Sequence, residues 1–214
     1  MNKIKIQKLY ELLYAHYGEL HWWPADSPYE VMVGAVLTQN TAWFNVKKAL
    51  AGFGTRLDPL FVVTASMDDI RDIIRPAGFY NQKSVYLKTL TKWFIGHGCS
   101  VDLIKSQPPE QIRRELLALR GIGAETADSI LLYAFDFPTF VVDNYTLRLT
   151  QRLYASGNRL SYDEAQRLYM KALDKSYYNN CHAMIVEVSK DYCRSKPLCD
   201  NCPLRGVCAA GTSG

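Results

Sequence analysis

The sequence has no long uninterrupted apolar run, although 48% of its 214 residues are hydrophobic. A membrane-spanning helix needs roughly 18 consecutive apolar residues, and no stretch of the chain approaches that length. The first residues, Met1–Lys5, are not followed by the apolar run of a signal peptide. These absences predict a protein with no membrane partner, and the cytoplasm is the expected location.

Strand patterns are also scarce. Phe140–Val142 is rich in strand formers but too short to anchor a sheet. Elsewhere apolar residues recur at helical spacing, and Ser27, Thr41 and Ser66 stand where N-caps are expected. The pattern therefore predicts an all-α protein. The expected helices cover residues 4–17, 28–37, 42–53, 66–74, 81–95, 108–119, 124–135, 143–154, 161–173 and 182–192.

The charge imbalance is small. The chain has 25 Lys and Arg residues against 21 Asp and Glu, which gives a net charge of +4. A mildly basic balance permits binding to an anionic polymer such as nucleic acid without requiring it.

Four of the six cysteines lie close together near the C-terminus, with the spacing Cys-x5-Cys-x2-Cys-x5-Cys: Cys193, Cys199, Cys202 and Cys208. In a chain without a signal peptide, such a group indicates a metal site rather than disulfides. Four thiolates suit either zinc or an iron–sulfur cluster, and the spacing alone leaves both open. Cys99, Cys181 and His182 have no predicted role beyond packing.

A glycine turn joins two predicted helices at Leu119–Ala127. Glycines at 121 and 123 let a ligand approach the backbone closely, and the start of the following helix suits a phosphate. The alternative is an ordinary helix–turn–helix connection that happens to use glycine.

Asp143 follows two valines and precedes a predicted helix. The simplest interpretation is an N-cap. A carboxylate held by backbone amides stays ionised, so it could also stabilise a cationic sugar or activate a water molecule. The two interpretations are compatible.

The glycine turn, Asp143 and the cysteine loop occur in an order that resembles the helix–hairpin–helix DNA glycosylases of the endonuclease III superfamily, over about residues 28–208. The resemblance implies a two-lobed, all-α fold with a C-terminal 4Fe–4S cluster loop. It implies a helical barrel over 27–137 and a second helical domain made of 1–26 and 138–208. Residues 209–214, small and polar, are expected to form a disordered tail.

The resemblance also implies a function: excision of a damaged base from double-stranded DNA by a monomer in a bacterial or archaeal nucleoid. The target nucleotide would flip out of the duplex, and Asp143 would stabilise the sugar cation. DNA contacts are expected around the hairpin and from Gln39, which would fill the gap left by the flipped base or serve only as a polar loop residue. The hairpin residues concerned are Gly121, Ile122, Gly123, Ala124 and Thr126.

Two departures from the superfamily pattern stand out. Bifunctional members have a lysine in the hairpin that attacks the sugar and cleaves the strand, whereas this chain has Glu125. Because glutamate cannot form a Schiff base, strand cleavage by that route should be missing. The cluster loop has five residues between its first two cysteines, one fewer than usual.

Several segments resemble one branch in particular, the bacterial 3-methyladenine DNA glycosylase III group; they are Trp22–Pro24, Val36–Thr41, Arg75–Lys83 and Gly121–Glu125. The best-known member of that branch lacks the cysteine loop. The resemblance implies that Trp22, Trp23 and Pro24 line a pocket for an alkylated purine, since a cationic base stacks well on an indole. Core packing is the alternative for the two tryptophans.

Other functions stay open at this point. One is an endonuclease III-like enzyme for oxidised pyrimidines or uracil with weak strand nicking. Another is a DNA-binding module without catalysis, and a third is a zinc-bound helical protein with no DNA role.

Overall fold

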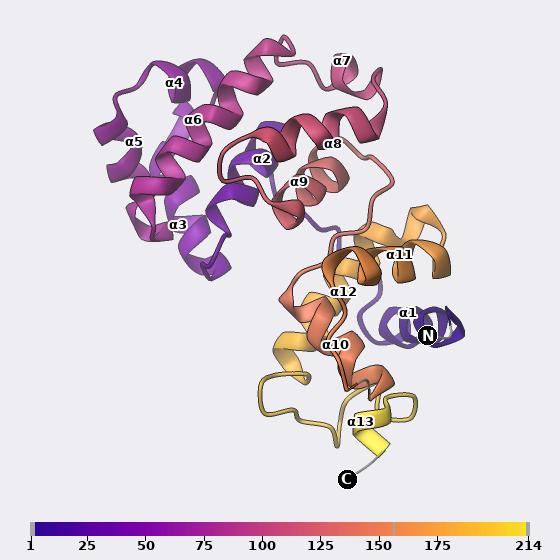
Figure 1. The fold of residues 1–214 in the computed structure, drawn as a ribbon. Helices are drawn as coiled ribbons and strands as arrows, with labels where there is room; N and C mark the ends of the chain where they lie inside the picture. The colour runs from indigo at the N-terminus through magenta and orange to yellow at the C-terminus, as the bar shows by residue number, and fades with distance from the viewer. Residues whose placement is uncertain (1–2, 156, 213–214) are drawn as a thin grey trace. The chain divides into compact units, whose positions relative to one another are not determined.

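The structure is a computed structural model that describes residues 3–155 and 157–212. It is all-α, as predicted, and no strand occurs within those ranges (Figure 1). The chain divides into two compact units, one formed by Trp23–Phe137 and the other by Met1–Trp22 together with Pro138–Gly214. None of the helices within the described ranges is long and apolar enough to cross a membrane.

The Trp23–Phe137 unit is built around α2 (Pro28–Leu37), which is buried along most of its length because it is apolar on nearly every side. Its N-cap is Ser27, whose side chain accepts a hydrogen bond from the Glu30 amide, as the sequence predicts. Around it lie α3 (Trp43–Phe53), η1 (Gly54–Arg56), α4 (Pro59–Thr64), α5 (Met67–Ile74), η2 (Arg75–Ala77), α6 (Tyr80–Gly96), α7 (Val101–Lys105), α8 (Pro109–Ala118), α9 (Ala124–Ser129) and η3 (Ile130–Ala134).

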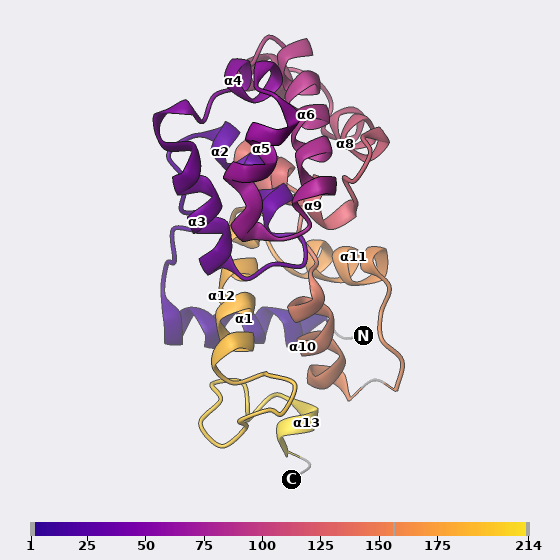
Figure 2. The ribbon, with the colours of Figure 1, turned by 90° about the vertical axis from the view of Figure 1, so that its left-hand side faces the viewer.

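The other unit begins with α1 (Lys3–Tyr17), which packs against α11 (Tyr162–Ala172) and α12 (Tyr178–Asp191). Between α11 and α12 lies the short η4 (Lys175–Tyr177). In Figure 2, α1 crosses this unit, and α10 (Asn144–Tyr154) stands beside α12. The helix α10 begins directly after Asp143 and contacts the cysteine loop that follows α12 through Arg148 and Arg152.

Several local predictions differ from the structure. Thr41 is not an N-cap: α3 is preceded by Ala42, and the Thr41 hydroxyl instead bonds to the carbonyl oxygens of Gln39 and Ala77. The helix expected over 124–135 changes at Ile130 into a π-helical turn, η3. The last long helix begins at Tyr178 rather than at residue 182.

The C-terminal tail also differs from the prediction. Residues 209–212 form a short helix, α13 (Ala209–Thr212), rather than a disordered segment. The reason is local packing: Gly211 is buried, and the position of a Cβ there lies 3.3 Å from the Arg205 carbonyl oxygen. The rest of the predicted tail, Ser213 and Gly214, lies outside the described residues.

Candidate functional site

The glycine turn closes a hairpin between α8 and α9. Gly121 has a φ of +83°, which a residue with a side chain adopts only with strain. Ile122 is buried in the core beneath the turn, whereas Gly123 is exposed and occupies the N-cap position of α9. Ile122 thus anchors the turn in the core, and Gly123 exposes its backbone at the start of α9.

Two side chains from other elements of the same unit hold this turn. The ring of Tyr86 lies so close to Gly121 that an added Cβ would stand 2.3 Å from it. Gln39, which follows α2, donates through Nε2 to the Gly121 carbonyl oxygen at 2.9 Å and to Thr126 Oγ1 at 3.0 Å. The Gln39 amide therefore connects the turn to the first residues of α9, a contact that its position in the sequence does not reveal.

An ion pair ties the two helices of the hairpin together. Arg113 of α8 donates from Nε and Nη2 to the two carboxylate oxygens of Asp128 in α9, at 2.7 and 3.0 Å. The Asp128 side chain is completely buried. A two-pronged pair of this kind fixes orientation as well as distance, so the angle between α8 and α9 depends on it.

The residues predicted to line a base pocket belong to different units. Trp22 lies in the unit with α12, where Lys190 Nζ is 5.8 Å from the centre of its ring. Trp23 belongs to the other unit; it packs on Gly34 and meets the ring of Trp43 edge-on, at 5.2 Å between centroids. Pro24 is exposed at the edge of a surface hollow of about 470 Å³ that Trp43 also borders.

Asp143 is the N-cap of α10, as its sequence position predicts. Its Oδ1 accepts hydrogen bonds from the Thr146 amide at 2.7 Å and the Thr146 hydroxyl at 2.8 Å. On the other side, Oδ2 lies 3.7 Å from Nε2 of His182, a residue of α12. The carboxylate is thus held by its own helix through one oxygen and faces an imidazole with the other.

The surroundings of Asp143 favour the ionised carboxylate. Burial alone raises the pKa of a carboxyl group, but His182 and the two hydrogen bonds from Thr146 outweigh it and lower the pKa of Asp143 below the usual value. The Asp143 side chain keeps 12% of its exposure. The group is therefore charged at neutral pH and only partly shielded from solvent.

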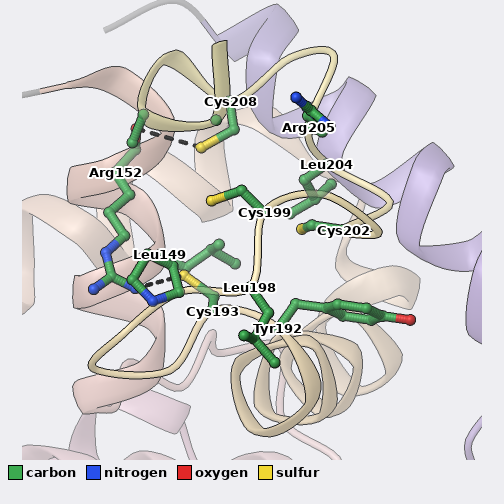
Figure 3. Close-up of a pocket in the computed structure, with 13 residues that line it drawn as sticks. Leu149, Arg152, Tyr192, Cys193, Leu198, Cys199, Cys202, Leu204, Arg205 and Cys208 are labelled. Carbon is green, nitrogen blue, oxygen red and sulfur yellow. Dashed lines mark hydrogen bonds between the residues drawn. The ribbon is translucent and has the colours of Figure 1, made fainter. Parts of the chain in front are cut away.

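The four clustered cysteines line one cavity between α10 and the loop that follows α12 (Figure 3). Its volume is about 30 Å³, and Leu149, Leu198 and Leu204 supply apolar walls. All four cysteines are free of disulfides. Within the described ranges, no three thiol, imidazole or carboxylate side chains approach closely enough to hold a single metal ion.

Two arginines of α10 fasten this cysteine loop. Arg148 Nε donates to the Cys193 carbonyl oxygen at 2.8 Å. Arg152 donates to the Cys193 sulfur at 3.3 Å and to the Ser195 carbonyl oxygen at 2.9 Å. The loop is therefore attached to the same helix that Asp143 caps, and the sequence analysis missed both arginines because their spacing along α10 resembles that of an ordinary exposed face.

Comparison with known proteins connects these features to a family. Residues 33–175 match the model of the HhH-GPD superfamily base excision DNA repair protein. A relative in Methanocaldococcus jannaschii, named "Putative DNA repair glycosylase", is 44% identical over 97% of both chains.

Solved structures agree with this match. A 3-methyladenine DNA glycosylase of H. pylori, bound to 1,N6-ethenoadenine, is 28% identical, with a TM-score of 0.76 over 89% of this chain and 98% of that one. An endonuclease III trapped covalently on DNA shares the fold, with a TM-score of 0.85 over 100% of this chain and 98% of that one at 23% identity. The chain is a DNA base-excision repair glycosylase and belongs to the helix–hairpin–helix HhH-GPD superfamily.

Proposed function

We propose that the protein is a monofunctional glycosylase that removes an alkylated purine such as 3-methyladenine from double-stranded DNA, with Asp143 as its catalytic carboxylate. The observation that carries the proposal is the setting of Asp143: its side chain is only 12% exposed, Thr146 fixes one of its oxygens, and its contacts with His182 and Thr146 lower its pKa. A negative charge fixed in advance in a poorly hydrated place stabilises a developing sugar cation strongly. The same carboxylate orients the water that attacks C1′.

An alkylated purine suits this arrangement because it leaves the sugar as a neutral base. No acid is needed to protonate such a leaving group, and a single carboxylate is sufficient for the chemistry. The similarity to a 3-methyladenine DNA glycosylase that binds 1,N6-ethenoadenine supports a modified adenine as the substrate. The aromatic contact between Trp23 and Trp43 supports it further, since electron-poor cationic bases stack well on indoles.

Monofunctional chemistry is supported by the hairpin. The side chain at the position of the strand-cleaving lysine is that of Glu125, which is exposed and has no amine. The buried amine of Lys83, in the same unit, donates to the carbonyl oxygens of Leu37 and Ala77 and to the Thr41 hydroxyl at 2.8–2.9 Å. With 2% of its surface exposed, Lys83 is unable to reach a sugar.

We also propose that Cys193, Cys199, Cys202 and Cys208 hold a 4Fe–4S cluster. The donor set fits, because four thiols line one apolar cavity. Burial raises the pKa of the Cys202 thiol, and its neighbouring cysteines raise it further, so thiolates there need bound cations. When bound, the cluster would order the loop that carries Arg194, Lys196 and Arg205.

In this proposal a monomer binds duplex DNA through the exposed backbone of the hairpin, with Gly121 and Gly123 allowing close approach of phosphates. Ile122 anchors the turn from below. Thr126 connects the turn to Gln39, whose side chain would have to leave the hairpin to enter a duplex. We propose that the protein acts in the cytoplasm, at the nucleoid.

A second candidate is an endonuclease III-like enzyme for oxidised pyrimidines or uracil with weak strand nicking. It is favoured by relatives such as the endonuclease III of Thermotoga maritima, 27% identical over 85% of this chain. A DNA-binding module without catalysis, the alternative of another class, disagrees with the match to DNA glycosylases.

The test is base release from methylated DNA and from a panel of lesion duplexes. Asp143→Asn should release base at least about 10³-fold more slowly than wild type while still binding DNA. Asp58→Asn is the matched control, because Asp58 caps α4 through the same type of contact, at 2.9 Å to the Phe61 amide, and should leave the rate unchanged. An active Asp143→Asn enzyme would end the assignment of Asp143.

The same samples separate the alternatives. Release of oxidised pyrimidines or uracil in preference to methylated purines would favour the second candidate. Binding without release of any base would favour the DNA-binding module. A covalent adduct trapped by borohydride would contradict monofunctional chemistry, and freshly purified protein lacking iron would contradict the cluster.

A further inference from the structure

The second oxygen of the Asp143 carboxylate faces His182, which takes no part in the chemistry proposed above. Thr146 supplies both hydrogen bonds to Oδ1, whereas Oδ2 lies 3.7 Å from His182 Nε2. Both side chains are almost buried, with 12% of Asp143 and 8% of His182 exposed. This distance is longer than a normal hydrogen bond, too short for a water molecule to stand between the atoms, and well within the range of an ion pair.

We propose that His182 is a positioning residue for the catalytic carboxylate: it directs an Nε2–H at Asp143 Oδ2 and so holds the carboxylate ionised and in one rotamer. The proposal rests on the assignment of Asp143 made above. His182 itself need not touch DNA.

The geometry explains why the imidazole presents a hydrogen to the carboxylate. A neutral ring with its hydrogen on Nδ1 would point a lone pair at Oδ2, which is repulsive. Either the other tautomer or the imidazolium places a hydrogen there. The carboxylate thus selects the state of the ring, and a small rotation of His182 brings the two atoms into hydrogen-bond distance.

The surrounding elements hold the ring in place. His182 lies on α12, which packs against α10. Its ring meets Phe140 edge-on, at 6.4 Å between centroids and an angle of 88°. Because Phe140 and His182 are both buried, the imidazole has little freedom to turn away from Oδ2.

Tyr169 of α11 is a further titratable group that interacts electrostatically with Asp143. Burial raises the pKa of Tyr169 far above its usual range, so its phenol stays neutral at working pH. It bonds to the Thr150 hydroxyl at 2.9 Å rather than to the carboxylate. Tyr169 therefore does not compete with His182 for Oδ2 of Asp143.

A fixed carboxylate matters because catalysis depends on charge that is already oriented when the sugar cation forms. With one oxygen bonded only to its own helix, the carboxylate could rotate about χ2 or take up a proton. Contact with His182 opposes both changes. The structure therefore assigns to α12 a part in catalysis that neither the hairpin nor the cysteine loop supplies.

The experiment compares His182→Leu, which removes the donor, with His182→Gln, which keeps an uncharged N–H donor. Single-turnover base release from methylated DNA is measured across pH, along with affinity for abasic-site DNA. We expect His182→Leu to slow release roughly 10-fold to 100-fold, as with other partners that orient a functional side chain, without loss of affinity. The acid limb of its pH profile should move to higher pH, because the carboxylate loses a stabilising partner. His182→Gln should recover most of the rate.

A second readout does not depend on activity. The carboxyl carbon of Asp143, followed by NMR during an acid titration, should show a higher pKa in His182→Leu than in wild type. A role in packing alone would lower thermal stability but leave both this titration and the acid limb unchanged, and that result would overturn the proposal.

Failure of this inference is distinguishable from failure of the proposed function. If Asp143→Asn is inactive while His182→Leu has the wild-type rate and titration, His182 has no positioning role and Asp143 keeps its assignment. If Asp143→Asn is fully active, the catalytic assignment fails, and the positioning proposal fails with it.

Discussion

Two aspartates with little exposed surface, one in each unit, differ in how their oxygens are used. Asp128 has no exposed side-chain surface, and Arg113 binds both of its oxygens. Asp143 has one oxygen bonded to Thr146 and the other 3.7 Å from His182, with part of its side chain still exposed. A carboxylate whose two oxygens both accept hydrogen bonds from a buried ion pair has a structural role. A carboxylate with one oxygen that accepts no normal hydrogen bond keeps that oxygen for chemistry.

Removing the structural partner should have the largest effect on stability. Arg113→Ala leaves the Asp128 carboxylate buried without the two hydrogen bonds from Arg113, and breaking a buried pair costs about 3–5 kcal/mol of unfolding free energy. Denaturant unfolding measures this loss. Arg71→Ala is the control, since its partner Asp68, at 2.8 Å, has a side chain that is 86% exposed, and the pair should contribute less than about 1 kcal/mol.

The distinction between the structural Asp128 and the catalytic Asp143 would be wrong if the folded fraction of Arg113→Ala released base as slowly as Asp143→Asn does. That outcome would make Asp128 a functional carboxylate rather than a structural one. Equal stability of Arg113→Ala and Arg71→Ala would likewise contradict a structural role for the buried pair.

The next largest effect concerns the two glycines of the hairpin, which have different reasons to be glycine. At Gly121 an added Cβ meets the Tyr86 ring at 2.3 Å, and φ is +83°. Gly121→Ala should therefore lower the free energy of unfolding by about 2–4 kcal/mol. At Gly123 nothing lies within 4 Å of an added Cβ, so Gly123→Ala should cost less than about 1 kcal/mol.

DNA affinity separates the two glycines further. If phosphates approach the exposed backbone at Gly123, the methyl group of Gly123→Ala should weaken binding of duplex DNA at nearly unchanged stability. Unchanged affinity in Gly123→Ala would place the DNA contact elsewhere. Fluorescence anisotropy at fixed salt is the appropriate measurement, because such binding depends strongly on ionic strength.

Sequence reasoning succeeded where the deciding interactions are local. The caps at Ser27 and Ser66 were predictable because each side chain bonds to an amide three residues further on. Asp143 as an N-cap is visible for the same reason. The N-cap predicted at Thr41 was wrong because the Thr41 hydroxyl donates to the carbonyl oxygen of Ala77, a contact that no local pattern encodes.

The partners of the two aspartates could not be found in the same way. His182 faces Asp143 only because α12 packs against α10; from sequence it was assigned to packing. Asp128 is paired with Arg113 because α9 packs against α8, a contact between helices that no local pattern encodes. Cys99, expected to be buried, is exposed in the turn that follows α6.

The smallest expected effect tests whether Asp143 is retained for stability. Asparagine caps helices about as well as aspartate, so Asp143→Asn should lower the free energy of unfolding at pH 7 by less than about 1 kcal/mol.

The difference in unfolding free energy between wild type and Asp143→Asn should become smaller as the pH falls. Because His182 and Thr146 lower the pKa of Asp143 in the folded protein, the ionised carboxylate stabilises the fold above the pKa of the unfolded chain, and this contribution is lost as pH falls through the lower, folded pKa. Denaturant unfolding of both proteins at pH 7 and in acid should therefore show a gap that closes in acid. A stability difference as large as that of Arg113→Ala, or one that widens in acid, would mean that Asp143, like Asp128, has a structural role.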